Sequence, residues 1–80
     1  MHEMHLIKNL FADLLKLARE NNAGKVTDVY LKMGEFTEIN ENILEFFFKE
    51  QAKNTILEGA KIHIRKSRMR ELTLVSFDCD

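Results

Sequence analysis

The sequence predicts an α+β fold, in which two helices cover one face of a small mixed three-stranded sheet in the order α-β-α-β-β. Two observations predict it. Apolar residues recur at the three-and-four spacing of amphipathic helices near residues 3–22 and 41–54. Segments near residues 26–36, 61–65 and 71–77 have the alternation or the β-branched and aromatic content of strands. A chain of 80 residues accommodates one such domain, spanning residues 1–80.

The composition narrows the class of protein. Hydrophobic residues make up 45% and charged residues 31% of the chain, as in soluble globular domains. A net charge of -1 excludes the general positive field of a non-specific nucleic-acid binder. The uncharged stretches are shorter than the roughly 20 residues of a membrane span, and no apolar signal segment follows the start, so we expect a cytoplasmic protein without membrane contact. The single cysteine, Cys79, cannot form an intramolecular disulfide or a four-ligand zinc site.

The first helix is predicted from about Glu3 to Asn22, and the first strand from about Val26 to Phe36. Gly24 is expected to end the helix in a left-handed conformation. Gly34 weakens the strand unless it marks a bulge or a close backbone approach, so we expect irregularity there.

The second helix is predicted to begin at Asn40 and Glu41 and to end near Asn54. Phe46 lies at the margin of its apolar stripe, either exposed or packed under a loop. The inner positions of this stripe are Leu44, Phe47, Phe48 and Gln51 or Ala52.

Two strands follow Gly59. Ile62 and Ile64 mark the second strand, and Glu71–Phe77 form the third. The connecting helix favours a right-handed parallel crossover between the first two strands. The short turn around residues 66–68 favours an antiparallel hairpin between the second and third.

The sequence contains no glycine-rich phosphate loop and no convincing nucleophile and base pair, so we expect a protein that is not an enzyme. Its distinctive feature is the start, Met1-His2-Glu3-Met4-His5. The Met1 amine and the His2 amide nitrogen close a five-membered ring on a metal, and the His2 amide and Nδ1 close a six-membered ring. Such a tetragonal nitrogen field suits Ni(II) or Cu(II) better than zinc or magnesium.

The fourth position of this chelate is left to Glu3, His5, water or a ligand from a partner. If the helix begins at Glu3, His2 and His5 can face the same side. The alternative is that His5 points to solvent in the first turn. The alternative for the whole motif is a disordered terminus with an incidental histidine.

Six segments along the chain form a distinctive ordered series: Met1-His2-Glu3, Asn22–Val26, Val29–Phe36, Leu44–Phe48, Thr55–Ile62 and Arg70–Phe77. Together they resemble the HypA/HybF family of nickel metallochaperones, which serve hydrogenase maturation and, in some organisms, urease maturation. The resemblance implies an α/β nickel-binding domain with the terminal amine and His2 as ligands. It also implies a supporting or partner-contacting role for Glu3.

Family members carry a zinc-ribbon domain between the second and third strands, where this chain has only Lys66-Ser67-Arg68-Met69. We therefore expect no zinc domain and no structural zinc. A surface connection tolerates insertion or loss of a domain, because the entropy of loop closure grows slowly with length. The family's zinc domain is associated with oligomerisation, so the oligomeric state stays open and a homo-oligomer is one possibility.

The remaining candidates concern partners and secondary ligands. The predicted hairpin is basic, and Arg65, Lys66 and Arg68 are its candidate partner contacts, although a solvated charge run is the default interpretation. His63 fits an ordinary surface residue on a strand. Cys79, near the end of the chain, is a minor candidate for binding a soft metal.

The leading hypothesis is a nickel-binding accessory protein that delivers Ni(II) to hydrogenase-maturation proteins or to a nickel-enzyme precursor. The alternative is a metal-free protein–protein interaction module on the same scaffold, which would tolerate an extension before Met1. Local RNA binding has only the basic hairpin in its favour, and it would show a steep dependence on salt.

Overall fold

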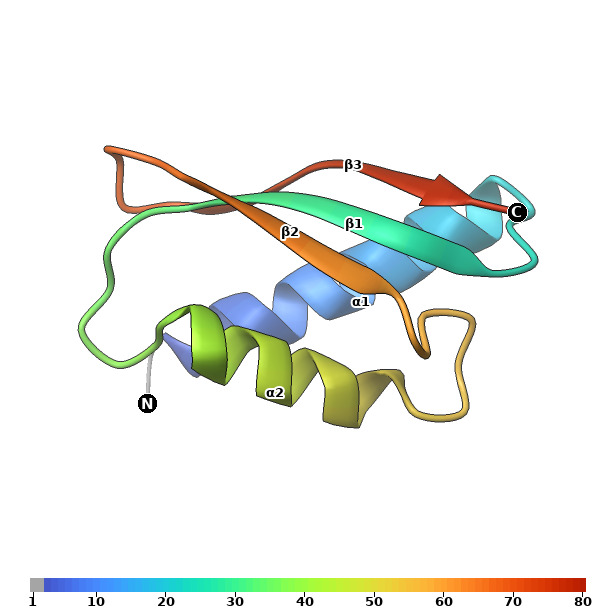
Figure 1. The fold of residues 1–80 in the computed structure, drawn as a ribbon, viewed down its shortest axis with the longest axis horizontal. Coiled ribbons are helices and arrows are strands. Elements are labelled where there is room, and N and C mark those ends of the chain that lie inside the picture. Colours follow the sequence, from blue (N-terminus) through green and yellow to red (C-terminus); the bar gives the residue numbers. More distant parts are fainter. Residues whose placement is uncertain (1–2) are drawn as a thin grey trace.

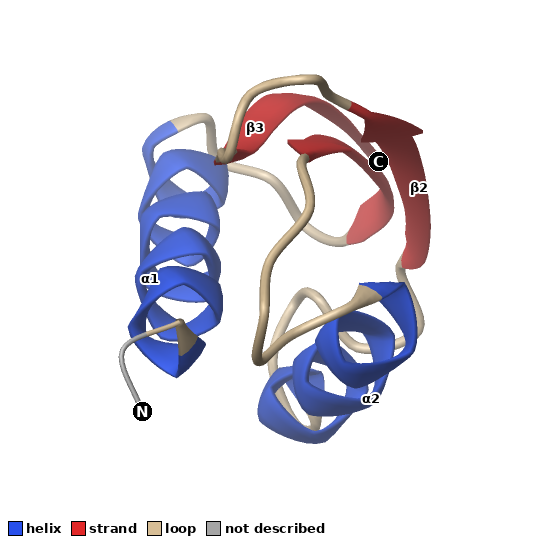
Figure 2. Cartoon of the chain, turned by 90° about the vertical axis from the view of Figure 1, so that its left-hand side faces the viewer, coloured by secondary structure: helices blue, strands red, loops and turns tan. Residues whose placement is uncertain are grey.

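The computed structural model describes residues 3–80 and contains two helices and one three-stranded sheet. Both helices lie on one face of the sheet (Figure 1), and the turned view shows the sheet curving over them, with α1 to its left and α2 below it (Figure 2). The α+β class and the element order are therefore confirmed. The elements are α1 (Met4–Glu20), β1 (Val26–Met33), α2 (Glu41–Ala52), β2 (Lys61–Lys66) and β3 (Leu72–Cys79).

The strand order is β2-β1-β3, so β1 lies in the centre of the sheet. β2 runs parallel to β1, with His63 opposite Tyr30, and β3 runs antiparallel to β1, with Ser76 opposite Tyr30. The parallel pair agrees with a helix-containing crossover. The predicted hairpin between β2 and β3 is wrong, because both strands pair with β1 instead of with each other.

The connection between β2 and β3, residues 67–71, carries the chain across the end of β1. The Ser67 amide donates to the Met33 carbonyl at 3.0 Å, and the Gly34 amide donates to the Glu71 carbonyl at 2.9 Å. Both ends of the connection are thus bonded to the end of β1, which separates the two edge strands. The short link between the second and third strands predicted a hairpin. However, five residues are also enough to pass the end of the single strand β1 and to reach its other side.

Gly34 makes this crossing possible. β1 ends at Met33, three residues before the predicted end at Phe36. A Cβ atom added to Gly34 would lie 1.8 Å from the backbone oxygen of Met69. Only a residue without a side chain fits there, so the expected irregularity is a close backbone approach.

α1 ends at Glu20, slightly before the predicted end, and the residue in the left-handed conformation is Asn22, with φ of 55°. The Ala23 amide donates to the Ala18 carbonyl at 3.0 Å, and the Asn22 amide donates to Arg19 at 3.0 Å. This pair of bonds is a Schellman motif. The prediction that Gly24 ends the helix in a left-handed conformation is wrong. Asn22 adopts that conformation two residues earlier, because asparagine tolerates the left-handed region.

α2 begins where predicted, because the Asn40 side chain accepts a hydrogen bond from the Ile43 amide at 2.9 Å. The helix ends at Ala52, before the predicted Asn54. Phe46 is 68% exposed, so its aromatic ring is a surface feature and does not pack under a loop. The positions of α2 that are buried against the sheet and α1 are Leu44, Phe48 and Ala52, while Phe47 is half-buried and Gln51 is exposed.

The core lies between the helices and the sheet. The rings of Phe11 and Phe48 meet edge to face at 5.3 Å and join the two helices. Ile7, Leu14 and Leu44 are fully buried. Within residues 3–80, no helix is long and apolar enough to cross a membrane.

Candidate metal centre at the amino terminus

Met1 and His2, which carry the predicted chelate, lie outside the described residues. The described chain begins at Glu3, immediately before α1. Figure 1 shows the start of α1, the loop after β1 and the β2–β3 connection at the same end of the molecule. Across residues 3–80, no group of three or more His, Cys, Asp or Glu side chains is arranged to hold a metal ion.

Glu3 is a buried carboxylate at this end, with 6% of the residue exposed. Its Oε2 accepts hydrogen bonds from the Thr37 amide at 3.1 Å and the Thr37 hydroxyl at 2.9 Å. Its Oε1 accepts from the amides of Glu38 and of Ile39, the latter at 3.2 Å. The Glu3 amide in turn donates to the Glu38 carboxylate at 3.2 Å. The residue next to His2 is thus bonded to segment 37–39 through its backbone and its side chain.

Arg70 completes the environment of Glu3 from a distant part of the chain. Its guanidinium forms an ion pair with Glu3 Oε2, although the two residues are 67 positions apart. The same group lies 5.6 Å from the centre of the Phe36 ring, in cation–π geometry. The Arg70 side chain is 61% exposed and that of Glu3 is 8% exposed. The β2–β3 connection therefore contacts the residue that precedes α1.

These contacts determine the ionisation of Glu3. Burial, the largest single influence, raises its pKa, whereas the hydrogen bonds from Glu38, Thr37 and Arg70 together outweigh burial and lower the pKa from 4.5 to about 2. Glu3 is thus ionised at neutral pH, and both of its oxygens are occupied by donors of this chain. Its carboxylate is buried and accepts hydrogen bonds from segment 37–39, so Glu3 is an anchor that joins the start of α1 to that segment.

Sequence reasoning did not identify Thr37 or Arg70 as neighbours of Glu3. Thr37 lies in the polar stretch before the second helix, and Arg70 lies at the start of the segment Arg70–Phe77 that resembles the family's closing strand. Neither pattern predicts a contact with Glu3. The available signal was the anionic Glu3 beside the first apolar residues of a helix, because a carboxylate placed there needs donors or a cation. Which donors it finds depends on the crossing at Gly34.

The other candidate ligands lie apart from one another. His5 is exposed in the first turn of α1, as expected if its ring points to solvent. Cys79 is an exposed free thiol at the end of β3, at the opposite end of the molecule in Figure 1. His63 lies on β2, where Nε2 is 2.9 Å from Asp28 Oδ1. The structure does not bring these three side chains together.

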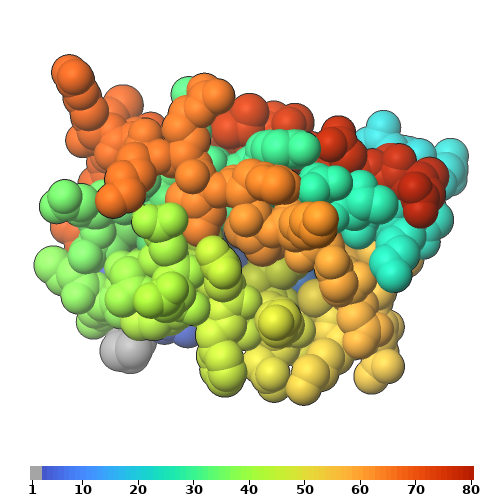
Figure 3. All heavy atoms as spheres, viewed as in Figure 1, coloured from blue at the N-terminus to red at the C-terminus, as the bar shows by residue number. Residues whose placement is uncertain are grey.

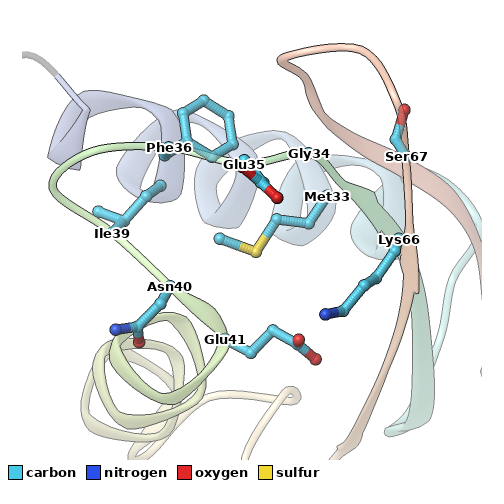
Figure 4. Close-up of a pocket in the computed structure, with 9 residues that line it drawn as sticks. All are labelled: Met33, Gly34, Glu35, Phe36, Ile39, Asn40, Glu41, Lys66 and Ser67. Atoms are coloured by element: carbon cyan, nitrogen blue, oxygen red, sulfur yellow. The ribbon is translucent and has the colours of Figure 1, made fainter.

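A pocket of about 290 Å³ adjoins the Glu3 anchor. Figure 4 shows two charged side chains that extend into this pocket. They are the Glu41 carboxylate, from the start of α2, and the Lys66 amine, from the end of β2. In the space-filling view, the atoms near residues 34–41 and those of the β2–β3 connection form one continuous surface at this end (Figure 3). The candidate partner contacts Arg65, Lys66 and Arg68 are exposed. The pocket is lined by Met33, Gly34, Glu35, Phe36, Ile39, Asn40, Glu41, Lys66 and Ser67.

Comparisons with known proteins match this chain to one family. The family model described as hydrogenase/urease nickel incorporation, metallochaperone, hypA matches residues 1–75. A relative from Archaeoglobus fulgidus, named hydrogenase maturation factor HypA, is 40% identical over 68 residues, which cover 85% of this chain and 62% of the relative. A protein of the same name from Aeromonas salmonicida is 30% identical over 80 residues, covering 100% of this chain and 68% of the relative.

The chain spans about half to three fifths of the length of the first relatives that it matches, with shares of 62%, 56% and 48%. The family is one of maturation metallochaperones and not of enzymes. Because the family model extends over residues 1–75, it includes the terminus, Glu3 and the Arg70 connection. This chain belongs to the HypA family.

Proposed function

We propose that this chain is a nickel-binding accessory protein that delivers Ni(II) during the maturation of hydrogenase or another nickel enzyme. The observation that carries the proposal is the match of residues 1–75 to a family described by nickel incorporation. That match includes Met1 and His2, whose amine, amide and imidazole nitrogens form a chelate suited to Ni(II). Nickel is the cargo in this proposal.

The geometry of Glu3 supports a specific donor set. The donors are the Met1 amine, the His2 amide nitrogen and His2 Nδ1. Glu3 is assigned as the anchor and not as the fourth ligand, because Thr37, Ile39 and the other donors around it already occupy its carboxylate. His5, water or a ligand from a partner takes the fourth position. An incompletely filled site suits transfer, because a ligand of the recipient can enter it.

The partners proposed are hydrogenase-maturation proteins or a nickel-enzyme precursor in the cytoplasm. Arg65, Lys66 and Arg68 form the exposed basic surface that would meet an acidic partner or a second copy of the chain. Acidic residues follow β1 and begin α2 at the same end of the molecule, including Glu35 and Glu41. Opposite charges on adjoining surfaces would orient the partner beside the metal-binding terminus.

Nickel titration of the untagged chain tests the proposal. We expect about one Ni(II) per chain and the absorption band of a square-planar nitrogen site. Two controls remove donors: His2→Ala removes the imidazole, and a Gly-Ser extension before Met1 removes the terminal amine. Unchanged binding by calorimetry in both would contradict the chelate and favour the metal-free interaction module.

The same protein tests the proposal that the fold needs no zinc. Among residues 3–80, a fourteen-member apolar core that includes Ile7, Leu14 and Leu44 supports folding by burial alone. Circular dichroism after chelator treatment should match that of the untreated protein. Loss of secondary structure, restored by zinc, would show that the scaffold depends on a metal.

A further inference from the structure

We propose that Arg70 is a positioning residue for the metal-binding terminus, which it orients by holding the Glu3 carboxylate from the β2–β3 connection. The inference rests on the proposed function. That function names the nitrogen atoms that bind nickel, and the inference adds a residue that orients them. His2 is covalently joined to Glu3, so whatever restrains Glu3 also limits the directions in which the two donor residues can leave α1.

The β2–β3 connection is itself held in place, which gives Arg70 a defined position. The Ser67 hydroxyl donates to the Glu71 carboxylate at 2.6 Å, and the Met69 amide donates to the Ser67 hydroxyl at 3.1 Å. The Glu71 amide donates to the Met69 carbonyl at 2.9 Å. Together with the bonds to the end of β1, these contacts restrain the backbone on both sides of Arg70.

The contact of Arg70 with Glu3 differs from an ordinary surface ion pair, because one partner is buried. The carboxylate side chain is only 8% exposed, so its charge is poorly solvated and needs a fixed cation and fixed donors. Thr37 and its neighbours supply donors on one side, and Arg70 supplies the cation. Phe36 beneath the guanidinium limits the directions open to Arg70. Removing Arg70 leaves Glu3 less restrained while the chelating atoms stay unchanged.

This arrangement predicts a separable effect on nickel binding. Arg70→Met preserves side-chain length and removes the charge. We expect a loss of nickel affinity on the order of tenfold, as for residues that orient metal ligands without binding the metal. The absorption band at saturation should keep its wavelength, because the donors are the same. Arg70→Lys, which retains the charge but not the planar fork, should restore part of the affinity.

A second readout needs no metal. In the metal-free protein, the heteronuclear NOE of the Glu3 amide reports the order of the terminus. It should fall in Arg70→Met and keep its wild-type value in the matched control Arg19→Met, which removes an exposed arginine from the far end of α1. The control should also bind nickel as wild type does.

The outcomes separate the inference from the proposed function. If Arg70→Met retains wild-type nickel affinity or a wild-type NOE at Glu3, Arg70 is not a positioning residue. If it only lowers the melting temperature while the folded protein binds nickel normally, its role is structural and the inference is overturned. An equal loss in Arg19→Met would assign the effect to net charge. A wild-type chain that binds no nickel would overturn the proposed function, whereas the NOE would still decide whether Arg70 orders the terminus.

Discussion

The ring of His63 stacks on that of Tyr30 across β1 and β2, with centroids 4.6 Å apart and planes inclined by 13°. The Tyr30 hydroxyl donates to Asp78 Oδ2 on β3 at 3.0 Å. His63 also meets Asp28 on β1. Because Tyr30 alternates with the buried Val29 and Leu31, this array lies on the sheet face opposite the helices. It connects the central strand to both edge strands.

Tyr30 should titrate above its ordinary pKa of 10.0. Its hydrogen bond to Asp78 raises the pKa most, and burial and the negative charges of Asp78 and Asp28 raise it further. The chain has one tyrosine and no tryptophan, so tyrosinate absorbance reports Tyr30 alone. Asp78→Asn should move the titration midpoint down toward 10.0. Because the pKa of Tyr30 is higher in the folded protein than in the unfolded chain, the protonated hydroxyl contributes to the free energy of unfolding. This contribution is fully present at pH values below the unfolded-state pKa, and it is lost as the pH rises through the folded-state pKa.

Asp80→Asn is the matched control, because it removes a carboxylate two residues further along the chain without removing the Tyr30 contact. Its midpoint should stay close to that of wild type. A Tyr30 midpoint equal in wild type and Asp78→Asn would show that the hydroxyl does not donate to Asp78 in solution.

Gly34→Ala should destabilise the protein by about 1–3 kcal/mol, because the new methyl group overlaps the Met69 backbone and forces the β2–β3 connection away. Gly24→Ala is the control, since its nearest atom would be the Asp80 oxygen at 4.0 Å. That variant should remain within about 1 kcal/mol of wild type, on the stabilising side. Urea unfolding compares the two. Equal free energies of unfolding would contradict the close crossing.

Leu44→Ala should lower the free energy of unfolding by about 2–5 kcal/mol, because it removes a fully buried side chain between α2 and the sheet. Phe46→Ala removes a larger side chain from the same helix, yet it should change stability by no more than about 0.5 kcal/mol, because Phe46 is 68% exposed. Thermal melting distinguishes them. A larger loss for Phe46→Ala would indicate that its ring is buried in solution, for example against a second copy.

His5→Ala should weaken nickel binding several-fold at most, whereas His2→Ala should remove most of it. The reason is that His5 is exposed in the first turn of α1. The His2 imidazole, in contrast, supplies Nδ1 and closes the six-membered ring of the proposed chelate, and His2→Ala leaves only the backbone amide of that residue. Calorimetry on the untagged variants measures both. If the two substitutions were equally damaging, His5 would be a full ligand and the chelate would include the first turn of the helix.

Local pattern was sufficient for the helices, because their formation depends on neighbours three and four residues apart. The stripe that includes Leu10 and Leu14 placed α1, and Asn40 placed the start of α2. The chelate proposed for Met1-His2 is likewise a prediction from local sequence, since its donors belong to adjacent residues. Ordered segments along most of the chain pointed to the family, and the match over residues 1–75 confirmed it.

Tertiary structure decided the strand order and the surroundings of Glu3. A short link between two strands fits a hairpin as readily as a crossing, and the crossing is present because Gly34 lets the Met69 backbone approach the end of β1. That crossing brings Arg70 to Glu3 across 67 positions. Periodicity carries no information about contacts at such separation, because they depend on how the assembled layers place two loops. The sequence by itself therefore determined the two helices and most of their buried positions, which depend on local periodicity, whereas packing decided the strand order and the contacts of Glu3.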